Sequence, residues 1–384
     1  MTDQKEQSVR ELKVAHIAPA TPHRCGLYET ARELVWMERK LGMDAHIVDP
    51  RPYARETVGK AKISGMETDC PECGHHYKIA TSKEEIPTRP PAWDEDREVC
   101  IAPVEWAVEE SDVIVSHSGL DSRFDDCDTP RIHLAHGRPN SSYRIEQSGE
   151  TPILSMYHKM ADDPRWKQMV TLWPGYGDYL RLLFPNVREL TPFVDLDRWT
   201  RKETGYDFDG KAGKINVVCC DVWRMDKDPF HVINAYALFA EKHPEARLHV
   251  YAVTADKGKG RDVLFQCLDE RGVMGTVRPV VGNLQQVYSA ADMVITPHRI
   301  GTRVVREALS CGCQVVAGNG NPYTQYTADV EDLREFSASM ESAWDDWKAN
   351  RVLCVQENRR VAETSFDLRS VAGEFIKMFE EVLS

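Results

Sequence analysis

Arg224 and Lys227 follow the apolar run of residues 215–220 and precede a helix-length segment. Two cations at the end of a strand can offset the charge of a leaving diphosphate. Gly301 and Thr302 open another helix-length segment, and the backbone N–H groups of a helix N-terminus also hold anions. These residues together indicate a phosphate-binding site. The alternative for Arg224 and Lys227 is that they are exposed loop charges without a ligand.

Strands and helices alternate around these residues. Residues 293–296 and 314–317 are apolar runs without polar alternation, which predicts strands buried on both faces of a parallel sheet. Between them, Thr302 is a good N-cap and Gly312 a typical helix terminator. Ligands of such doubly wound sheets bind beyond the carboxyl ends of the strands. The loop of residues 297–303 has that position.

The first half of the chain begins with the same rhythm. We expect a strand at 12–18, a turn, a helix and a strand at 44–48. Gly26 is at the helix N-terminus, where a glycine lets a ligand approach the backbone closely. A further strand, 132–135, ends at His136, and we assign His133 to the core. The plainer interpretations are a tight turn for Gly26 and a satisfied core histidine for His136.

Composition limits the class of protein. The chain has 384 residues, enough for two or three domains, with 42% hydrophobic and 28% charged residues. It contains no apolar run of about 18 residues, and its polar start lacks an apolar signal core. Eleven cysteines are scattered without a framework, so we expect a cytoplasmic protein. A net charge of −13 argues against a protein that coats nucleic acid.

Residues 51–98 interrupt the strand–helix rhythm and are locally basic. They contain Cys70 and Cys73 in a Cys-Pro-Glu-Cys-Gly sequence that is typical of a zinc knuckle. His75 or His76 could supply a third ligand, and Cys100 or Cys127 a fourth. The alternative is a loop with two free thiols. The basic residues could dock an acidic acceptor or simply form a solvated face.

The sequence Glu307-Ala-Leu-Ser-Cys-Gly-Cys-Gln-Val-Val resembles part of the nucleotide-sugar signature of family four retaining glycosyltransferases, which have the GT-B fold. Residues 22–34 resemble the N-terminal loop of these enzymes. The resemblance implies an α/β protein with two Rossmann-like doubly wound domains facing across a cleft and a C-terminal helix that crosses back. We expect an acceptor-side domain at 1–199, a linker at 200–214, a donor-binding domain at 215–366 and the returning helix at 367–384.

The resemblance also implies roles for individual residues. Glu307 would hold the ribose hydroxyls, and Gly301 and Thr302 would face the donor. Arg299 occupies the position of the first glutamate of the signature, which changes how the sugar is held. Other segments of the chain also match the family. By this resemblance, Arg224 and Lys227 would clamp the diphosphate. His136 would lie by the donor sugar, and Gly26 would face the donor phosphates.

The implied activity is transfer of a sugar, as in a hexosyltransferase, from a UDP- or GDP-sugar to an acceptor hydroxyl with retention. This chemistry requires no catalytic metal, so any zinc would be structural. The basic insertion suggests a large acidic acceptor, either nucleic acid with hydroxylated bases or an anionic glycan. Two other classes of function are compatible with the sequence. The first is a nucleotide-sugar or nucleic-acid binding protein without transferase activity. The second is another enzyme with the same fold, such as a sugar-nucleotide epimerase or a phosphorylase, although the cofactor lysine motif of a phosphorylase is absent.

The knuckle sequence predicts that Cys70 and Cys73 bind structural zinc with His75 or His76. Elemental analysis of protein purified without any chelator is expected to find zinc. Changing both cysteines to serine should remove it, because the thiolates are the strong ligands. Wild-type protein without zinc would contradict the prediction.

Overall fold

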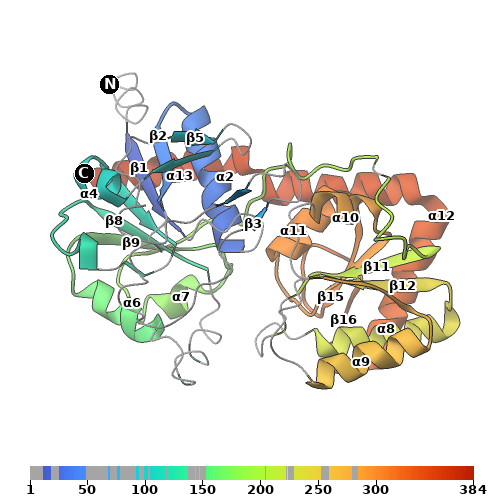
Figure 1. The fold of residues 1–384 in the computed structure, drawn as a ribbon. Coiled ribbons are helices and arrows are strands. Elements are labelled where there is room, and N and C mark those ends of the chain that lie inside the picture. Colours follow the sequence, from blue (N-terminus) through green and yellow to red (C-terminus); the bar gives the residue numbers. More distant parts are fainter. Residues whose placement is uncertain are drawn as a thin grey trace. The chain divides into compact units, whose positions relative to one another are not determined.

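The computed structural model describes residues 12–18, 26–48, 68–69, 76–77, 92–94, 99–102, 104–117, 119–120, 122–136, 143, 147, 153–203, 205–221, 223, 229–251, 259–278 and 284–384. The chain forms two compact units, one of Met1–Pro192 with Leu368–Ser384 and one of Phe193–Asp367. Figure 1 shows their elements. Within the described ranges, no helix is both long and apolar enough to cross a membrane.

The first unit contains a sheet that, in the described residues, has eight strands in the order β10-β9-β8-β7-β1-β2-β6-β5. All neighbouring strands pair in parallel except β5 with β6. The strands are β1 (Lys13–Ile17), β2 (Asp44–Val48), β5 (Ala92–Asp94), β6 (Val99–Ala102), β7 (Val113–Ser116), β8 (Arg131–Ala135), β9 (Trp166–Thr171) and β10 (Val187–Glu189). A separate antiparallel pair consists of β3 (Thr68–Asp69) and β4 (His76–Tyr77).

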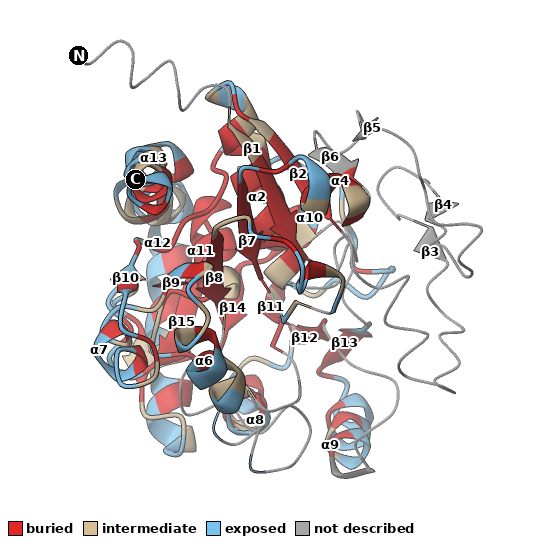
Figure 2. Cartoon of the chain, turned by 90° about the vertical axis from the view of Figure 1, so that its left-hand side faces the viewer, coloured by how far each residue is buried: buried red, intermediate tan, exposed pale blue. Residues whose placement is uncertain are grey.

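The helices of this unit are α2 (Gly26–Lys40), α4 (Val104–Glu109), η3 (Ser122–Phe124), α6 (Ile153–Ala161), α7 (Gly177–Leu180) and α13 (Leu368–Leu383). The strands β7 and β8 are buried along their whole length, as Figure 2 shows for β7. Ala15 and Ile17 of β1 pack into a core with Trp106 of α4. The C-terminal helix α13 packs on α2, and its buried residues include Phe375 and Met378.

The second unit contains a parallel sheet, with six strands in the described residues, in the order β13-β12-β11-β14-β15-β16. Its strands are β11 (Ile215–Cys219), β12 (Ala246–Val250), β13 (Met274–Val277), β14 (Met293–Ile295), β15 (Gln314–Gly318) and β16 (Thr327–Ala328). Its helices are α8 (Phe230–Lys242), α9 (Lys259–Glu270), α10 (Leu284–Ala290), α11 (Arg303–Ser310) and α12 (Leu333–Phe366).

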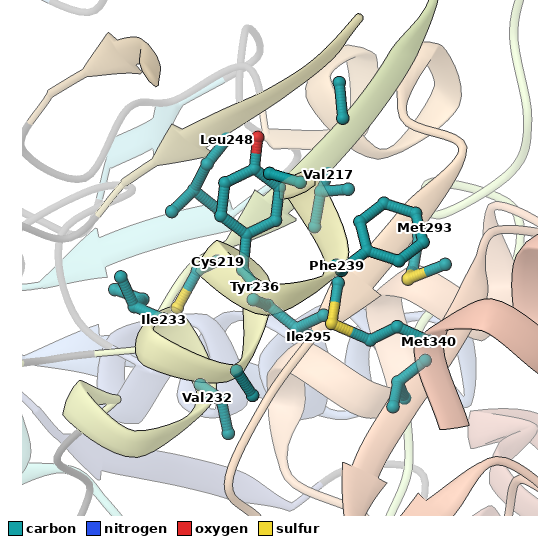
Figure 3. Close-up of a cluster of buried hydrophobic side chains, with 14 of the residues drawn as sticks. Val217, Cys219, Val232, Ile233, Tyr236, Phe239, Leu248, Met293, Ile295 and Met340 are labelled. Carbon is teal, nitrogen blue, oxygen red and sulfur yellow. The ribbon is translucent and has the colours of Figure 1, made fainter. Parts of the chain in front are cut away.

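Both faces of this second sheet are buried. In Figure 1, α10 and α11 cover one face, and α8 and α9 cover the other. Val217 and Cys219 of β11 pack with Tyr236 and Phe239 of α8, as Figure 3 shows. Val218, which points to the opposite face, packs in a core with residues of α10 and α11. Alternate residues of one strand therefore enter two different cores, as an apolar run without polar alternation predicts.

The predicted α/β class with parallel sheets is confirmed, but some element bounds were wrong. The sequence of residues 170–174 predicts a strand there, whereas the structure has β9 at Trp166–Thr171. The first half of β9 includes exposed Lys167 and buried polar Gln168 and lacks an apolar run. The sequence of residues 176–183 predicts a short helix, and the structure limits this helix to α7, Gly177–Leu180. Residues 200–214, which the sequence suggests as a linker, belong to the second unit, where Phe208 is buried.

Gly312 ends α11 with a φ of +71°, which confirms the predicted terminator. A Cβ atom there would lie 2.7 Å from Val355 Cγ1, whereas at Gly320, with a φ of +86°, it would meet nothing within 4 Å. Alanine at either position should cost about 1–2 kcal/mol of backbone strain. Gly312→Ala should lose a further ~1–3 kcal/mol because it overpacks the core. Urea unfolding of both variants measures this difference, and equal losses would contradict the close contact.

Candidate functional site

The carboxyl ends of β11 and β14 are the natural binding position of the second unit. The chain runs from β11 outward to β12 and β13, and then returns to the other side of β11 at β14. Such a reversal of strand order opens a crevice at the strand ends, where ligands of doubly wound sheets bind. The loop after β11 begins at Cys220, and the loop after β14 begins at Thr296.

A buried contact between an aspartate and a histidine joins these two loops. Asp221 Oδ1 lies 2.8 Å from His298 Nε2, and the two side chains are 2% and 3% exposed. The backbone of His298 is held in place, because its carbonyl accepts hydrogen bonds from Gly318 N and from the Asn321 side-chain amide, both at 3.1 Å. The other carboxylate oxygen, Asp221 Oδ2, is buried and has no hydrogen-bond partner in the described structure.

Glu307 lies on α11 and is only 5% exposed. Its Oε1 accepts from Arg303 Nε at 2.7 Å, one helical turn earlier. Glu307 is therefore not a surface residue, although a charged residue on a Rossmann-like helix could equally be exposed. A carboxylate that is buried and held by one arginine is oriented before any ligand arrives. Nearby, burial raises the pKa of the Cys311 thiol to about 12, so this cysteine is not a reactive thiolate.

Thr302 precedes α11 in an extended conformation, at the N-cap position that the sequence predicts. Its hydroxyl does not cap the helix: Oγ1 is buried and makes no hydrogen bond within the described residues. The neighbouring Gly301 is required by packing, since a Cβ atom there would lie 2.8 Å from Tyr323 Cε2 and 3.1 Å from Phe366 Cε1. The helix therefore begins with backbone N–H groups that its own N-cap side chain does not satisfy.

Arg299 follows β14 and is exposed. Its side chain lies close to the glycine that ends β15, because a Cβ atom at Gly318 would be 3.2 Å from Arg299 Cγ. The structure thus places Arg299, Gly301, Thr302 and Glu307 on one loop–helix segment of the second unit. The predicted cations Arg224 and Lys227 lie outside the described residues, as do Cys70, Cys73 and His75; His76 belongs to β4, and its side chain is not described.

The two remaining predicted residues belong to the first unit. Gly26 is the exposed first residue of α2, and its carbonyl accepts from Thr30 Oγ1 at 2.8 Å. His136 directly follows β8 and is half-buried, and its carbonyl accepts from Trp173 Nε1 at 3.0 Å. His136 Nε2 lies 2.9 Å from His117 Nδ1. His133 is buried, as predicted, and burial lowers its pKa to about 4, so it is a neutral core residue.

Sequence reasoning missed several polar residues near the strand ends. In the second unit these are Asp221, His298 and Arg303, and in the first unit Glu38, His16 and His117. The available signal was position, since Asp221 and His117 each stand directly after an apolar run that predicts a buried strand. Which of these residues meet depends on strand order, which no local pattern reveals.

Around the switch point of the second unit, the structure therefore combines an arginine-paired carboxylate, a buried Asp–His pair and a helix N-terminus. A carboxylate accepts hydrogen bonds from hydroxyl groups, whereas unsatisfied N–H groups at a helix start bind anions. A ligand that carries both hydroxyl groups and phosphate would use both features.

No protein-family model and no curated protein matches the chain. Several solved structures do match, at 10–12% identity. One is sucrose-phosphate synthase from Thermosynechococcus elongatus, with a TM-score of 0.67 and 12% identity over 97% of this chain and 99% of that chain. A second is HepE from Anabaena in complex with UDP and glucose, with a TM-score of 0.66 and 11% identity over 96% of this chain and 100% of that chain. A third is the pneumococcal O-GlcNAc transferase GtfA in complex with UDP and GlcNAc, with a TM-score of 0.60 and 10% identity over 97% of this chain and 99% of that chain. The chain has the GT-B fold of these glycosyltransferases, as the sequence predicts.

The buried Asp221–His298 pair gives a prediction for stability. His298→Leu leaves a buried carboxylate without its partner and should destabilise the second unit by about 3–5 kcal/mol. Adding Asp221→Asn removes the stranded charge and should recover part of that loss. Denaturant unfolding of both single variants and the double variant measures the coupling. Strictly additive losses would show that the two side chains do not interact.

Proposed function

We propose that this protein is a glycosyltransferase that moves a sugar from a nucleoside diphosphate sugar to an acceptor hydroxyl. The observation that carries the proposal is Glu307, a buried and arginine-paired carboxylate on the helix after β14, in a chain with the GT-B fold. HepE, which shares the fold, has been solved with UDP-glucose. In our proposal Glu307 accepts hydrogen bonds from the ribose hydroxyls of such a donor.

The rest of the switch point supplies the groups that a diphosphate needs. The N-terminus of α11 and the Thr302 hydroxyl can donate hydrogen bonds to phosphate oxygens. Arg224 and Lys227 follow β11 in the sequence, and in this proposal they balance the charge that grows on the diphosphate as its bond to the sugar breaks. Binding and positioning of this kind can supply a large part of the rate acceleration.

In this proposal the reaction retains the configuration at the anomeric carbon. The bond between the sugar and the diphosphate oxygen breaks, and the acceptor oxygen forms its bond on the same face of the sugar. The acceptor hydroxyl passes its proton to a donor phosphate oxygen, so no pair of protein carboxylates is required. We also propose that the acceptor is large and acidic. This part of the proposal is supported only by the basic sequence of residues 51–98.

A binding protein without transferase activity is the second candidate, and Arg299 favours it. This exposed arginine stands where the signature of the similar enzymes has its first glutamate. Turnover separates the two functions: release of nucleoside diphosphate that depends on an added acceptor supports a transferase. Tight binding of the donor without any release supports the binding protein.

Glu307→Ala is expected to weaken binding of the donor by about 1.5–3 kcal/mol, the scale of hydrogen bonds to a charged group. Isothermal titration with UDP-glucose and GDP-mannose measures the change for whichever donor binds the wild type. Glu363→Ala is a matched control, because Glu363 also pairs with an arginine one turn earlier but is exposed. Equal affinity of the Glu307 variant and the wild type, with both proteins folded, would remove Glu307 from the site.

A further inference from the structure

Arg299 of the second unit lies between two carbonyl groups that one buried side chain holds. The side-chain amide of Asn321 donates to the carbonyl oxygen of His298 at 3.1 Å and to that of Ile300 at 3.2 Å. Asn321 is only 4% exposed and follows β15, which pairs with β14. The backbone before and after Arg299 is therefore fixed by contacts within this unit.

The partners of Asn321 determine which residue type fits at this position. Its amide nitrogen faces two carbonyl oxygens, whereas its Oδ1 accepts from Tyr323 N at 3.1 Å. An ionised aspartate could donate to neither carbonyl, and a serine could donate to only one. Both the donor and the acceptor side of the amide thus have partners, as burial of an amide requires.

The stem of the Arg299 side chain is confined as well. Gly318, which ends β15, donates its N–H to His298 O at 3.1 Å. A Cβ atom at Gly318 would lie 2.4 Å from the carbonyl oxygen of Pro297 and 3.2 Å from Arg299 Cγ. The glycine therefore lets the segment that carries Arg299 pack closely against the end of β15. Most of the remaining freedom of the arginine is in its outer atoms.

The guanidinium group of Arg299 is exposed and has no carboxylate partner among the residues that the structure describes. Other arginines of the second unit differ, as Arg278 pairs with Asp209 at 2.7 Å. An arginine stays charged at every accessible pH, and its fork of N–H groups matches the oxygens of a phosphate. Arg299 is therefore a cation whose backbone is fixed and whose charge is unpaired in the described structure.

The same fixed segment leads directly into α11. Ile300 O, which Asn321 holds, also accepts from Thr302 N at 2.8 Å, and Thr302 is the N-cap residue of the helix. The Thr302 hydroxyl is buried, has no hydrogen-bond partner in the described structure and does not cap the helix. Free N–H groups at a helix start attract anions. A cation and an anion-binding helix end thus lie three residues apart on one segment.

We propose that Arg299 is an anion-binding residue of the second unit and that Asn321 is the positioning residue that holds it near the N-terminus of α11. The ligand group is a phosphate, because its oxygens can accept from a guanidinium and from backbone N–H groups together. A diphosphate has enough oxygens for both. That this diphosphate belongs to a nucleotide sugar rests on the proposed function, whereas the anion site itself does not.

Inorganic diphosphate tests the site without any nucleotide. Isothermal titration should show binding to the wild type, and Arg299→Gln should weaken this binding about tenfold or more, because hydrogen bonds from a charged group are lost. Arg360→Gln is the matched control, since Arg360 of α12 is also exposed, and it should bind as the wild type does. A wild type that binds no diphosphate, or an Arg299→Gln variant with wild-type affinity, would overturn the proposal.

A double-mutant cycle tests the role of Asn321. Asn321→Ala should weaken diphosphate binding about tenfold, because Arg299 must then be ordered as the ligand binds, and should have a much smaller effect in the Arg299→Gln background. Asn319→Ala removes an exposed asparagine two positions earlier and should leave the affinity unchanged. Should Asn321→Ala not fold, Asn321→Ser, which keeps one donor, replaces it in the cycle. Equal losses in both backgrounds would contradict a role of Asn321 through Arg299.

Turnover separates this inference from the proposed function. Diphosphate binding that depends on Arg299, in a protein that turns over no nucleotide sugar, would support the anion site and contradict the transferase. With a nucleotide sugar that the wild type turns over, Arg299→Gln should raise KM about tenfold, in line with its loss of phosphate affinity. If Arg299→Gln and Asn321→Ala both keep the KM and kcat of the wild type, the transferase stands and the roles of Arg299 and Asn321 are refuted.

Discussion

Burial of both sheet faces is the constraint on which the rest of this structure depends. Alternate residues of β11 enter two separate cores, so its side chains Val217, Val218 and Cys219 must all be apolar. Polar groups that contact a ligand can then only follow the strands. In both units they gather where the strand order reverses, at β11 and β14 in one and at β1 and β7 in the other. The position of the site is therefore a consequence of the hydrophobic core.

The same burial demands that polar groups at these strand ends have partners. Asp221 pairs with His298, Glu307 with Arg303, and Glu38 with His16, at 2.7 or 2.8 Å in each case. A buried pair of this kind adds little net stability, because the loss of hydration offsets most of the attraction. It does hold each side chain in one orientation. A site built from such pairs is in place before the ligand binds, which reduces the ordering cost of binding.

Local sequence patterns predicted the elements well but not the contacts between them. Apolar runs located β14 and β15, and the positions of Thr302 and Gly312 predicted where α11 begins and ends. The helix α12 was missed, although Phe336, Met340, Ala343 and Trp347 follow helical spacing, and its 34 residues include a non-helical Asn350. The contact between His16 and His117 could not be predicted at all. His16 and His117 are 101 positions apart, and only the placement of β7 beside β1 brings them together.

The two units use buried carboxylates in different ways. Around the switch point of the second unit, Glu307 is held by Arg303, an arginine that stays charged at every accessible pH. In the first unit, the imidazole rings of His16 and His117 lie between Glu38 and His136. The two nitrogens of a neutral imidazole ring can exchange their donor and acceptor roles. The pair with Arg303 therefore gives Glu307 one partner of fixed charge and fixed geometry. In the first unit, the donor and acceptor roles of the ring nitrogens depend instead on the partners that each histidine meets, so the orientation of Glu38 is tied to three strands of the sheet rather than to one turn of a helix.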